Sequence, residues 1–290
     1  MRHMGDVLAG IHATWEFESD AVVIRFERGI RTPRLFQALR ERRIPHEALA
    51  SVTLAPGKRG TVVLHAVPRP GSDPLMEAAA GQLKDVCDPY RLVLPAERET
   101  LAEYYRDELR SVLADRPGGV DDGPADGFLV AAPEGPQSFK AYDGKATFDG
   151  TSEVAFRWFW TGASSEKWKA GDQTFPVREL SGIEWRSPDV FDGYLRLLPR
   201  HGEPQHAQAD RDPAAVVFGL GYGPVHESLP FAASVLAAIR GAGRATPLEA
   251  ERRDPAGVAE RIRQLGDLHR AGLVTDEEFT AKKAELLAEL

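Results

Sequence analysis

Short apolar runs alternate with turn residues along most of the chain. Runs such as AVVIRF (21–26), SVTL (51–54) and TVVLHAV (61–67) are rich in β-branched residues and are separated by Gly, Pro and Asp. This pattern is typical of antiparallel strands joined by turns. A similar pattern returns in the second half of the chain, so we expect a mainly β fold.

Two longer segments instead place apolar residues at helical spacing. Residues 95–113 predict an amphipathic helix with an apolar face of Leu101, Tyr105, Leu109 and Val112. Residues 226–239 predict a second helix, with a face of Leu229, Ala232, Val235, Leu236 and Ile239. Neither helix can bury its face alone, so we expect each to plug the open end of a small β-barrel or sandwich. The predicted fold class is therefore α+β, mainly β with α.

The two halves of the chain resemble each other. ATWEFESDAVVIRF (13–26) can be laid without gaps on ATFDGTSEVAFRWF (146–159), and DPYRLVL from Asp88 lies on DPAAVVF from Asp212. A further block between them pairs Pro45 with Pro176, Leu49 with Leu180, Val52 with Ile183, and Pro68-Arg69 with Pro199-Arg200. Three blocks in the same order predict two divergent copies of one fold whose loops differ in length.

Two stretches rich in Pro, Gly and charged residues mark linkers. FLVAA (128–132), just after the first glycine-rich stretch, is expected to form the first strand of the second copy. The predicted organisation is repeat 1 (1–115), linker (116–136), repeat 2 (137–240), linker (241–256) and a helical hairpin (257–290).

The C-terminal segment predicts two short helices. Gly272 lies where a left-handed helix C-cap belongs, and Thr275 with Glu278 has the spacing of a capping box that opens the second helix. A unit below about 40 residues without metal or disulfide seldom folds alone. We therefore expect its apolar stripe to pack against another chain or against a domain of its own.

IRQLGDLHRAGLVTDEEFTAKKAELLAEL (262–290) resembles the SHOCT family, the short C-terminal domain. The resemblance implies an oligomerising or docking role toward a protein partner or a second copy, so we expect a homo-oligomer. The residues expected to make the contact are Ile262, Leu265, Leu268, Phe279, Leu286 and Leu287.

The repeated body resembles the actinobacterial family known as domain of unknown function 4429, which is related to pleckstrin-homology-like (PH-like) domains. This resemblance rests on IPHEALASV (44–52), FPVRELSGI (175–183) and the two terminal helices. It implies two tandem PH-like repeats. The family carries no assigned catalytic residues.

Composition narrows the functional classes. The 290 residues carry a formal net charge of −8, which disfavours a nucleic-acid partner. Cys87 is the single cysteine, so an intrachain disulfide and a thiolate zinc site are excluded. No apolar run approaches the roughly 18 residues of a membrane span. We expect a soluble cytoplasmic protein.

The candidate chemical motifs are weak. GLGYGPVHES (219–228) lacks the G-x-G-x-x-G spacing, and Pro224 removes an amide donor, so we interpret it as a structural turn. His201 and His206, near Asp210 and Asp212, fit a solvated loop better than a surface metal site. Since no G-x-S-x-G motif is present either, we expect no enzymatic activity, no bound metal and no cofactor.

The arginine-rich segment 25–43 leaves two alternatives open. Its arginines could pair with neighbouring acids on a solvated face, or they could contact an anionic surface such as a membrane. The second alternative uses Arg28, Arg31, Arg34, Arg40, Arg42 and Arg43. RWFW (157–160) in the other copy is a possible partner patch or inter-repeat interface.

These observations favour a non-catalytic interaction or scaffold protein that assembles or docks through its C-terminal hairpin. The alternative is a peripheral protein that binds an anionic surface or a small ligand through the arginine-rich segment.

Overall fold

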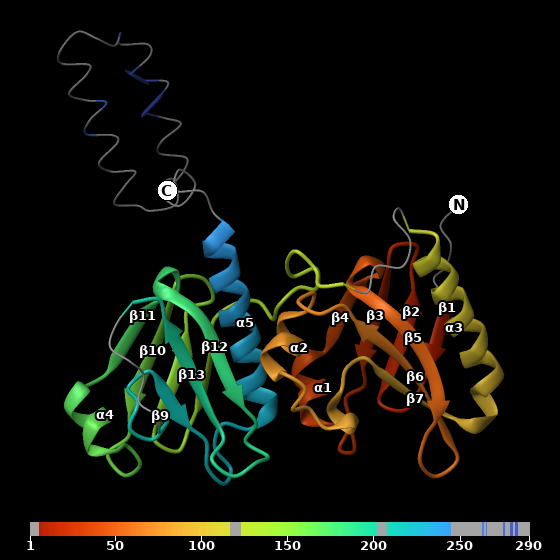
Figure 1. The fold of residues 1–290 in the computed structure, drawn as a ribbon, viewed down its shortest axis with the longest axis horizontal. Coiled ribbons are helices and arrows are strands. Elements are labelled where there is room, and N and C mark those ends of the chain that lie inside the picture. Colours follow the sequence, from red (N-terminus) through yellow and green to blue (C-terminus); the bar gives the residue numbers. More distant parts are fainter. Residues whose placement is uncertain are drawn as a thin grey trace. The chain divides into compact units, whose positions relative to one another are not determined.

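The computed structural model describes residues 6–116, 123–201 and 208–244, together with Arg263, Leu265, Thr275, Phe279, Thr280, Lys282 and Lys283. The chain divides into two compact units, Met1–Ile239 and Arg240–Leu290. The first unit contains both copies of the repeat, and each copy folds into antiparallel strands followed by a long helix (Figure 1).

The first copy contains a four-stranded and a three-stranded antiparallel sheet. The four-stranded sheet has the order β1 (Asp6–Ala9), β2 (Ala13–Phe17), β3 (Ala21–Phe26) and β4 (Glu41–Pro45). The three-stranded sheet has the order β5 (Leu49–Pro56), β6 (Thr61–Pro68) and β7 (Arg91–Pro95). The helices are α1 (Arg34–Leu39), η1 (His46–Ala48), α2 (Pro74–Ala79), η2 (Asp85–Cys87), η3 (Ala96–Arg98) and α3 (Glu99–Ala114).

The second copy repeats this arrangement. Its four-stranded sheet has the order β11 (Gln173–Pro176), β10 (Glu153–Trp158), β9 (Gly144–Phe148) and β8 (Gln137–Lys140). Its three-stranded sheet has the order β12 (Leu180–Arg186), β13 (Tyr194–Pro199) and β14 (Ala215–Val217). The helices are α4 (Ser165–Ala170), η4 (Val177–Glu179) and α5 (Val225–Arg244).

The fold is α+β, as predicted, but neither half is a closed barrel. Among the described strands the two sheets of each copy stay separate, and an isolated bridge between Ile11 and Val93 links them in the first copy. The chain passes from one sheet to the other through η1 and η4, which follow Pro45 and Pro176. Of the two predicted alternatives, a barrel or a sandwich, the closed barrel was wrong, whereas the prediction of antiparallel strands followed by a terminal helix in each half is confirmed.

The terminal helices cover the apolar side chains between the sheets. Helix α3 packs mainly on β5 and buries Ala102, Tyr105, Leu109 and Leu113. Leu101 and Val112, which the helical pattern placed on this face, are exposed. Residues three or four apart on a helix can be joined into one stripe in more than one way. The sequence pattern therefore identified Tyr105 and Leu109 in the middle of the buried face but not Ala102 and Leu113 at its ends. In α5 all five predicted residues are buried.

The internal repeat is confirmed in detail. Both copies carry a β-bulge just after the equivalent residues Leu49 and Leu180. In both copies an Asx turn opens the last strand: Asp88 accepts a 2.9 Å hydrogen bond from the Tyr90 amide, and Asp212 accepts one of 2.8 Å from the Ala214 amide. The two halves are therefore divergent copies of one fold.

The ungapped alignment of 13–26 on 146–159 was wrong in register. Ala13 pairs with Phe26 across β2 and β3, whereas Gly144 pairs with Trp158 across β9 and β10. Gly144 is therefore the counterpart of Ala13, two residues before the one predicted. A shift of two residues keeps the same face of a strand buried, so the apolar alternation could not reveal it, and the turn between β9 and β10 is one residue longer than the turn between β2 and β3.

The segment between β6 and β7 joins the two copies. Helix α2, in this segment, packs against β12, and its buried residues Leu75, Ala78 and Ala79 belong to the apolar core of the second copy (Figure 1). The Gln82 side chain donates to the Trp185 carbonyl at 2.9 Å and accepts from the Ser187 amide at 2.9 Å. The apolar core of the second copy thus includes residues contributed by the first.

FLVAA (128–132) does not form a strand, so that prediction was wrong. The amides of Leu129 and Val130 donate to the Ser72 carbonyl, and Val130 is buried in the core of the first copy. The first strand of the second copy is β8 instead.

Little of the second unit is described. The Phe279 amide donates to the Thr275 carbonyl at 2.9 Å, which is a helical hydrogen bond, and the Lys283 ammonium lies 5.7 Å from the centre of the Phe279 ring. Leu265 and Phe279 are half-buried. The other predicted contact residues, Ile262, Leu268, Leu286 and Leu287, lie outside the described residues, and so does the capping-box residue Glu278.

Candidate functional site

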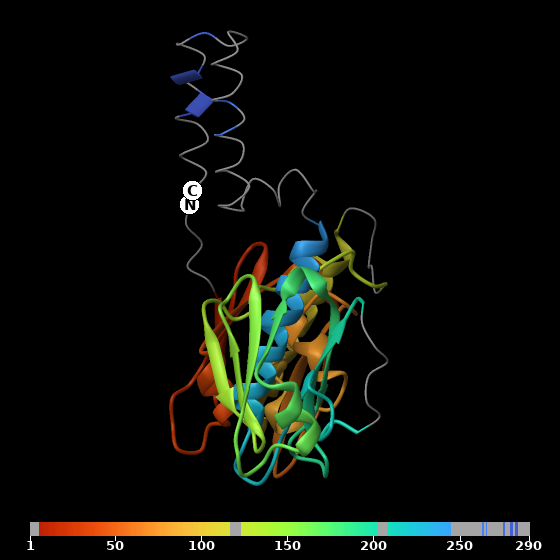
Figure 2. The same ribbon diagram turned by 90° about the vertical axis from the view of Figure 1, so that its left-hand side faces the viewer.

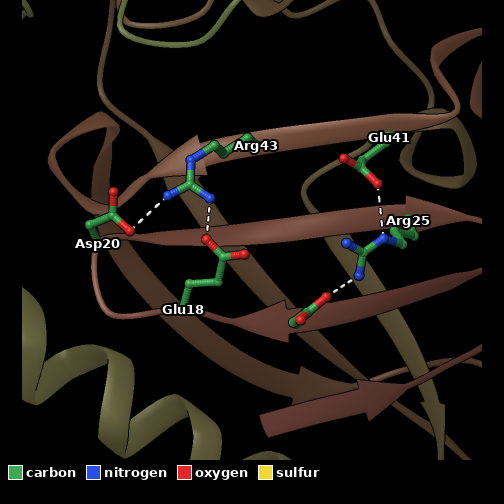
Figure 3. Close-up of polar contacts among 6 residues, drawn as sticks. Glu18, Asp20, Arg25, Glu41 and Arg43 are labelled. Carbon is green, nitrogen blue, oxygen red and sulfur yellow. Dashed lines mark hydrogen bonds and ion pairs between the residues drawn. The ribbon is translucent and has the colours of Figure 1, made fainter. Parts of the chain in front are cut away.

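The arginine-rich segment spans β3, a turn, α1 and β4, and its arginines fall into separate groups. Arg25 on β3 is paired with Glu16 and, at 2.8 Å, with Glu41. Arg43 on β4 is paired with Glu18 and, at 2.7 Å, with Asp20. Figure 3 shows both guanidinium groups held between two carboxylates on the exposed face of the sheet. Hydrogen bonding to Glu16 raises the pKa of Arg25, and hydrogen bonding to Glu18 raises that of Arg43.

Arg42 has a structural role. Its side chain is buried and donates to Asp73 at 2.7 Å. The same carboxylate accepts the Tyr90 hydroxyl at 2.7 Å and caps α2 by accepting the Leu75 amide at 2.8 Å. Burial raises the pKa of Tyr90 well above its usual value. Because Arg42 alternates with Arg43 on β4, it points into the protein, and we withdraw it from the predicted set of surface contacts.

The remaining arginines of the predicted set, Arg28, Arg31, Arg34 and Arg40, are exposed. In the part of the chain that the structure describes, none of them forms an ion pair or a side-chain hydrogen bond. Arg28 and Arg31 flank Ile30, whose side chain is fully exposed at 105%. These four residues are therefore the part of the segment that is free to meet a ligand.

Ile30 and Arg31 occupy the two central positions of a tight turn. The Thr32 amide donates to the Gly29 carbonyl at 3.1 Å. The Gln37 side-chain amide donates to the Gly29 carbonyl at 3.0 Å and to the Thr32 carbonyl at 2.9 Å. The turn is thus braced from α1. Turn positions usually hold Gly, Pro, Asn, Asp or Ser, so an exposed isoleucine is unexpected there.

The second copy carries an equivalent turn between β10 and α4. The Gly162 amide donates to the Phe159 carbonyl at 3.2 Å, and Trp160 occupies the first central position with 79% of its surface exposed. Its ring contacts Trp168 edge-on at 5.1 Å. Trp158, by contrast, is buried and donates to the Gly171 carbonyl. Both copies therefore place one large apolar side chain at the tip of the same turn.

A third turn of this kind lies between β14 and α5, in the GLGYGPVHES segment. The Tyr222 amide donates to the Gly219 carbonyl at 2.9 Å, and Leu220 at the tip is fully exposed at 102%. Gly221 follows at a φ of 81°, a conformation that favours glycine. The predicted turn is confirmed.

The turns that carry Ile30 and Leu220 lie beside the first turn of α5. A pocket of about 590 Å³ is lined by Phe191, Leu220, Tyr222 and Val225, and Phe191 itself is 88% exposed. A second pocket, of about 740 Å³, is lined by Ile30, Arg34 and, from α5, His226.

The turn bearing Trp160 belongs to the same end of the unit. A Cβ on Gly162 would lie 2.3 Å from the Tyr142 carbonyl oxygen, and the Tyr142 and Tyr222 rings are 6.3 Å apart. In Figures 1 and 2, α1, α4 and the start of α5 lie toward the lower edge of the first unit. We call Ile30, Trp160, Phe191 and Leu220 the apolar tips.

The buried polar groups of the second copy are engaged in packing. Lys167 of α4 donates to Asp143 at 2.5 Å and to the Ala215 carbonyl at 2.8 Å, and its ammonium lies 4.9 Å from the centre of the Trp158 ring. Burial lowers the pKa of Lys167 and raises that of Asp143. This pair ties α4 to β14.

Within the described residues, no group of three or more His, Cys, Asp and Glu side chains could hold a metal ion. His201 is exposed, and His206 lies outside the described residues. Burial raises the pKa of the Cys87 thiol. Over the same residues, no helix combines the length and the apolar character needed to cross a membrane.

The sequence interpretation identified the arginines and Trp160 but missed Ile30, Phe191 and Leu220. The available signal was a large apolar residue inside a turn: R-G-I-R and G-L-G. A pattern of apolar and polar residues assigns such a residue to the core, and only the fold shows that its side chain points outward.

Comparison with known proteins agrees with the internal repeat. A family model described as Domain of unknown function (DUF4429) matches residues 15–110 and 146–236, more than half of the chain. A second model, described as Short C-terminal domain (SHOCT), matches residues 260–287. No curated protein matches the chain.

Proposed function

Because this chain belongs to the DUF4429 family and ends in a SHOCT domain, we propose that it is a non-catalytic interaction protein of the cytoplasm. Its paired repeats present the binding surface, and its C-terminal hairpin docks or self-associates to bring several such surfaces together. The observation that carries the proposal is that Ile30, Phe191 and Leu220 line pockets beside the first turn of α5, and that the Trp160 turn reaches this region through Tyr142.

The assignment of both copies to a PH-like fold is also part of this proposal. Each copy has four strands, then three strands, then a helix across the apolar side chains. This order supports the relation to PH-like domains that the sequence suggested. Because one fold can host many functions, the function is argued from the site.

Exposed apolar side chains support a binding role. Single exposed apolar residues are ordinary, but a group of them marks an interaction site. The tips lie on turns braced by hydrogen bonds, so their exposure is built into the fold. The buried polar groups offer no competing catalytic constellation among the described residues, since Arg42, Asp73, Lys167 and Asp143 all serve packing.

The assembly role is tested by the solution mass of the full chain and of a chain that ends at Pro255, measured by light scattering. We expect the full chain to be oligomeric and the truncated chain to be monomeric. Multiplying a weak binding surface in this way raises its overall affinity. Two monomers would contradict self-assembly and leave docking to a different protein as the role of the hairpin.

A further inference from the structure

We infer that the apolar tips, together with Arg28, Arg31 and Arg34, form a surface that binds anionic lipid membranes peripherally. This inference names the partner of the surface proposed above. It does not depend on assembly through the hairpin, because every residue that it uses lies in the first unit.

The shape of the apolar surface favours a fluid partner. Ile30, Trp160 and Leu220 each stand at the tip of a different turn, and two of them are fully exposed. Separate protruding side chains can each enter the interfacial layer of a bilayer, whereas a protein partner would have to supply a matching pocket for every one. Tryptophan is also enriched at the level of the lipid headgroups.

The charge of the surface favours an anionic membrane. Arg28, Arg31 and Arg34 have no carboxylate partner among the described residues, although Arg25 and Arg43 in the same segment each have two. A chain with a net charge of −8 would readily supply acids to neutralise them. Guanidinium groups bind phosphate by paired hydrogen bonds, so unpaired arginines beside an exposed isoleucine fit a layer of acidic phospholipid headgroups.

The acidic side chains near the apolar tips do not neutralise the three arginines. Asp189, in the turn before Phe191, is paired with Lys84 at 2.9 Å. Glu227 faces His226 at 3.7 Å. Burial lowers the pKa of His226. Among the described exposed carboxylates that form no ion pair, Glu27 and Asp192 lie closest in sequence to the tips, and they oppose but do not cancel the three arginines.

The first test is sedimentation of the full chain with vesicles of phosphatidylcholine, with and without phosphatidylserine, across a salt series. We expect binding that requires phosphatidylserine and weakens with salt. The double variant Arg28→Gln/Arg31→Gln should bind about five-fold more weakly for each arginine removed. The matched control, Arg25→Gln/Arg43→Gln, changes the net charge equally at paired sites and should bind nearly as well as the unaltered chain.

The second test asks whether the apolar tips insert into the bilayer. Ile30→Ser/Leu220→Ser should weaken vesicle binding by about ten-fold for each side chain, whereas Val7→Ser/Tyr104→Ser removes exposed apolar side chains on β1 and α3 and should not. Lipids brominated on their acyl chains should quench Trp160 and Trp168 fluorescence, because Trp15, Trp158 and Trp185 are buried. Trp160→Phe should reduce that quenching and leave only the part that comes from Trp168, which is less exposed.

Several results would overturn the inference. One is the absence of sedimentation with phosphatidylserine vesicles at low salt, and another is equal binding by the tip variants and their controls. A fall in solution mass on Ile30→Ser/Leu220→Ser without any vesicle binding would assign the tips to contact between copies. If the hairpin fails to assemble the chain, the variant pattern on vesicles still decides the inference, so the two failures are distinguishable.

Discussion

Asp73 is the residue on which the joint between the copies depends. Its carboxylate is fully buried and binds the Arg42 guanidinium, the Tyr90 hydroxyl and the α2 N-terminus. Removal of one member of a buried ion pair leaves an uncompensated charge, which typically costs about 3 to 5 kcal/mol. Arg42→Gln should therefore lower the free energy of unfolding by that amount, as measured by urea denaturation.

The control for this prediction is Arg43→Gln in the neighbouring exposed pairs. Exposed ion pairs contribute about 0 to 1 kcal/mol, so this variant should unfold within about 1 kcal/mol of the unaltered chain. Equal losses at Arg42 and Arg43 would show that burial of the Asp73 network does not contribute to stability.

Asp149, in the turn between β9 and β10, predicts a pH dependence. Burial opposes ionisation, but hydrogen bonds from Ser152 and from the backbone amides of Thr151 and Glu153 outweigh it and hold the pKa at about 2. The folded pKa lies below the unfolded value of 3.8. Its stabilisation is therefore fully present above pH 3.8 and is lost as the pH falls toward about 2.

Because Asp149 is exposed, we expect that contribution to be only about 1 kcal/mol after solvent screening. Asp149→Ala should lose it at pH 7, in a comparison of urea midpoints. The difference between the two proteins should shrink as the pH approaches 2. A constant difference over this range would mean that the carboxylate charge is not responsible.

At the scale of the elements, the alternation of apolar and polar residues predicted the strands and the positions of both terminal helices. The same rule accounts for Arg42, because Arg42 and Ile44 alternate with Glu41 and Arg43 on β4 and both point inward. Both alternatives for the arginine-rich segment rested on its composition, and so both placed Arg42 at the surface. Strand register and the exposure of the tips could not be predicted, because both depend on contacts between residues far apart in sequence.

Gly162 should be required for the turn that carries Trp160. A Cβ there would lie 2.3 Å from the Tyr142 carbonyl oxygen and 2.9 Å from the Asp143 Cα, both of which are backbone atoms. Overpacking of this kind costs about 1 to 3 kcal/mol, so Gly162→Ala should lower the melting temperature. Gly241→Ala in α5 meets no atom within 4 Å and should be neutral or slightly stabilising. A Gly162→Ala protein as stable as the original would show that the turn can shift.

At the scale of the whole first unit, the two copies should unfold together because α2 of one copy completes the core of the other. Leu75→Ala opens a cavity at this joint and should cost about 2 to 5 kcal/mol, and we expect it to split one calorimetric transition into two as the copies lose their coupling. Leu109→Ala removes an equally buried leucine from the core of the first copy. It should lower stability by a similar amount while keeping a single transition.

Coupled copies would also hold the tips of both in one fixed arrangement, so Leu75→Ala should weaken vesicle binding without altering any tip. Two transitions in the unaltered chain would show that the shared core does not couple the copies.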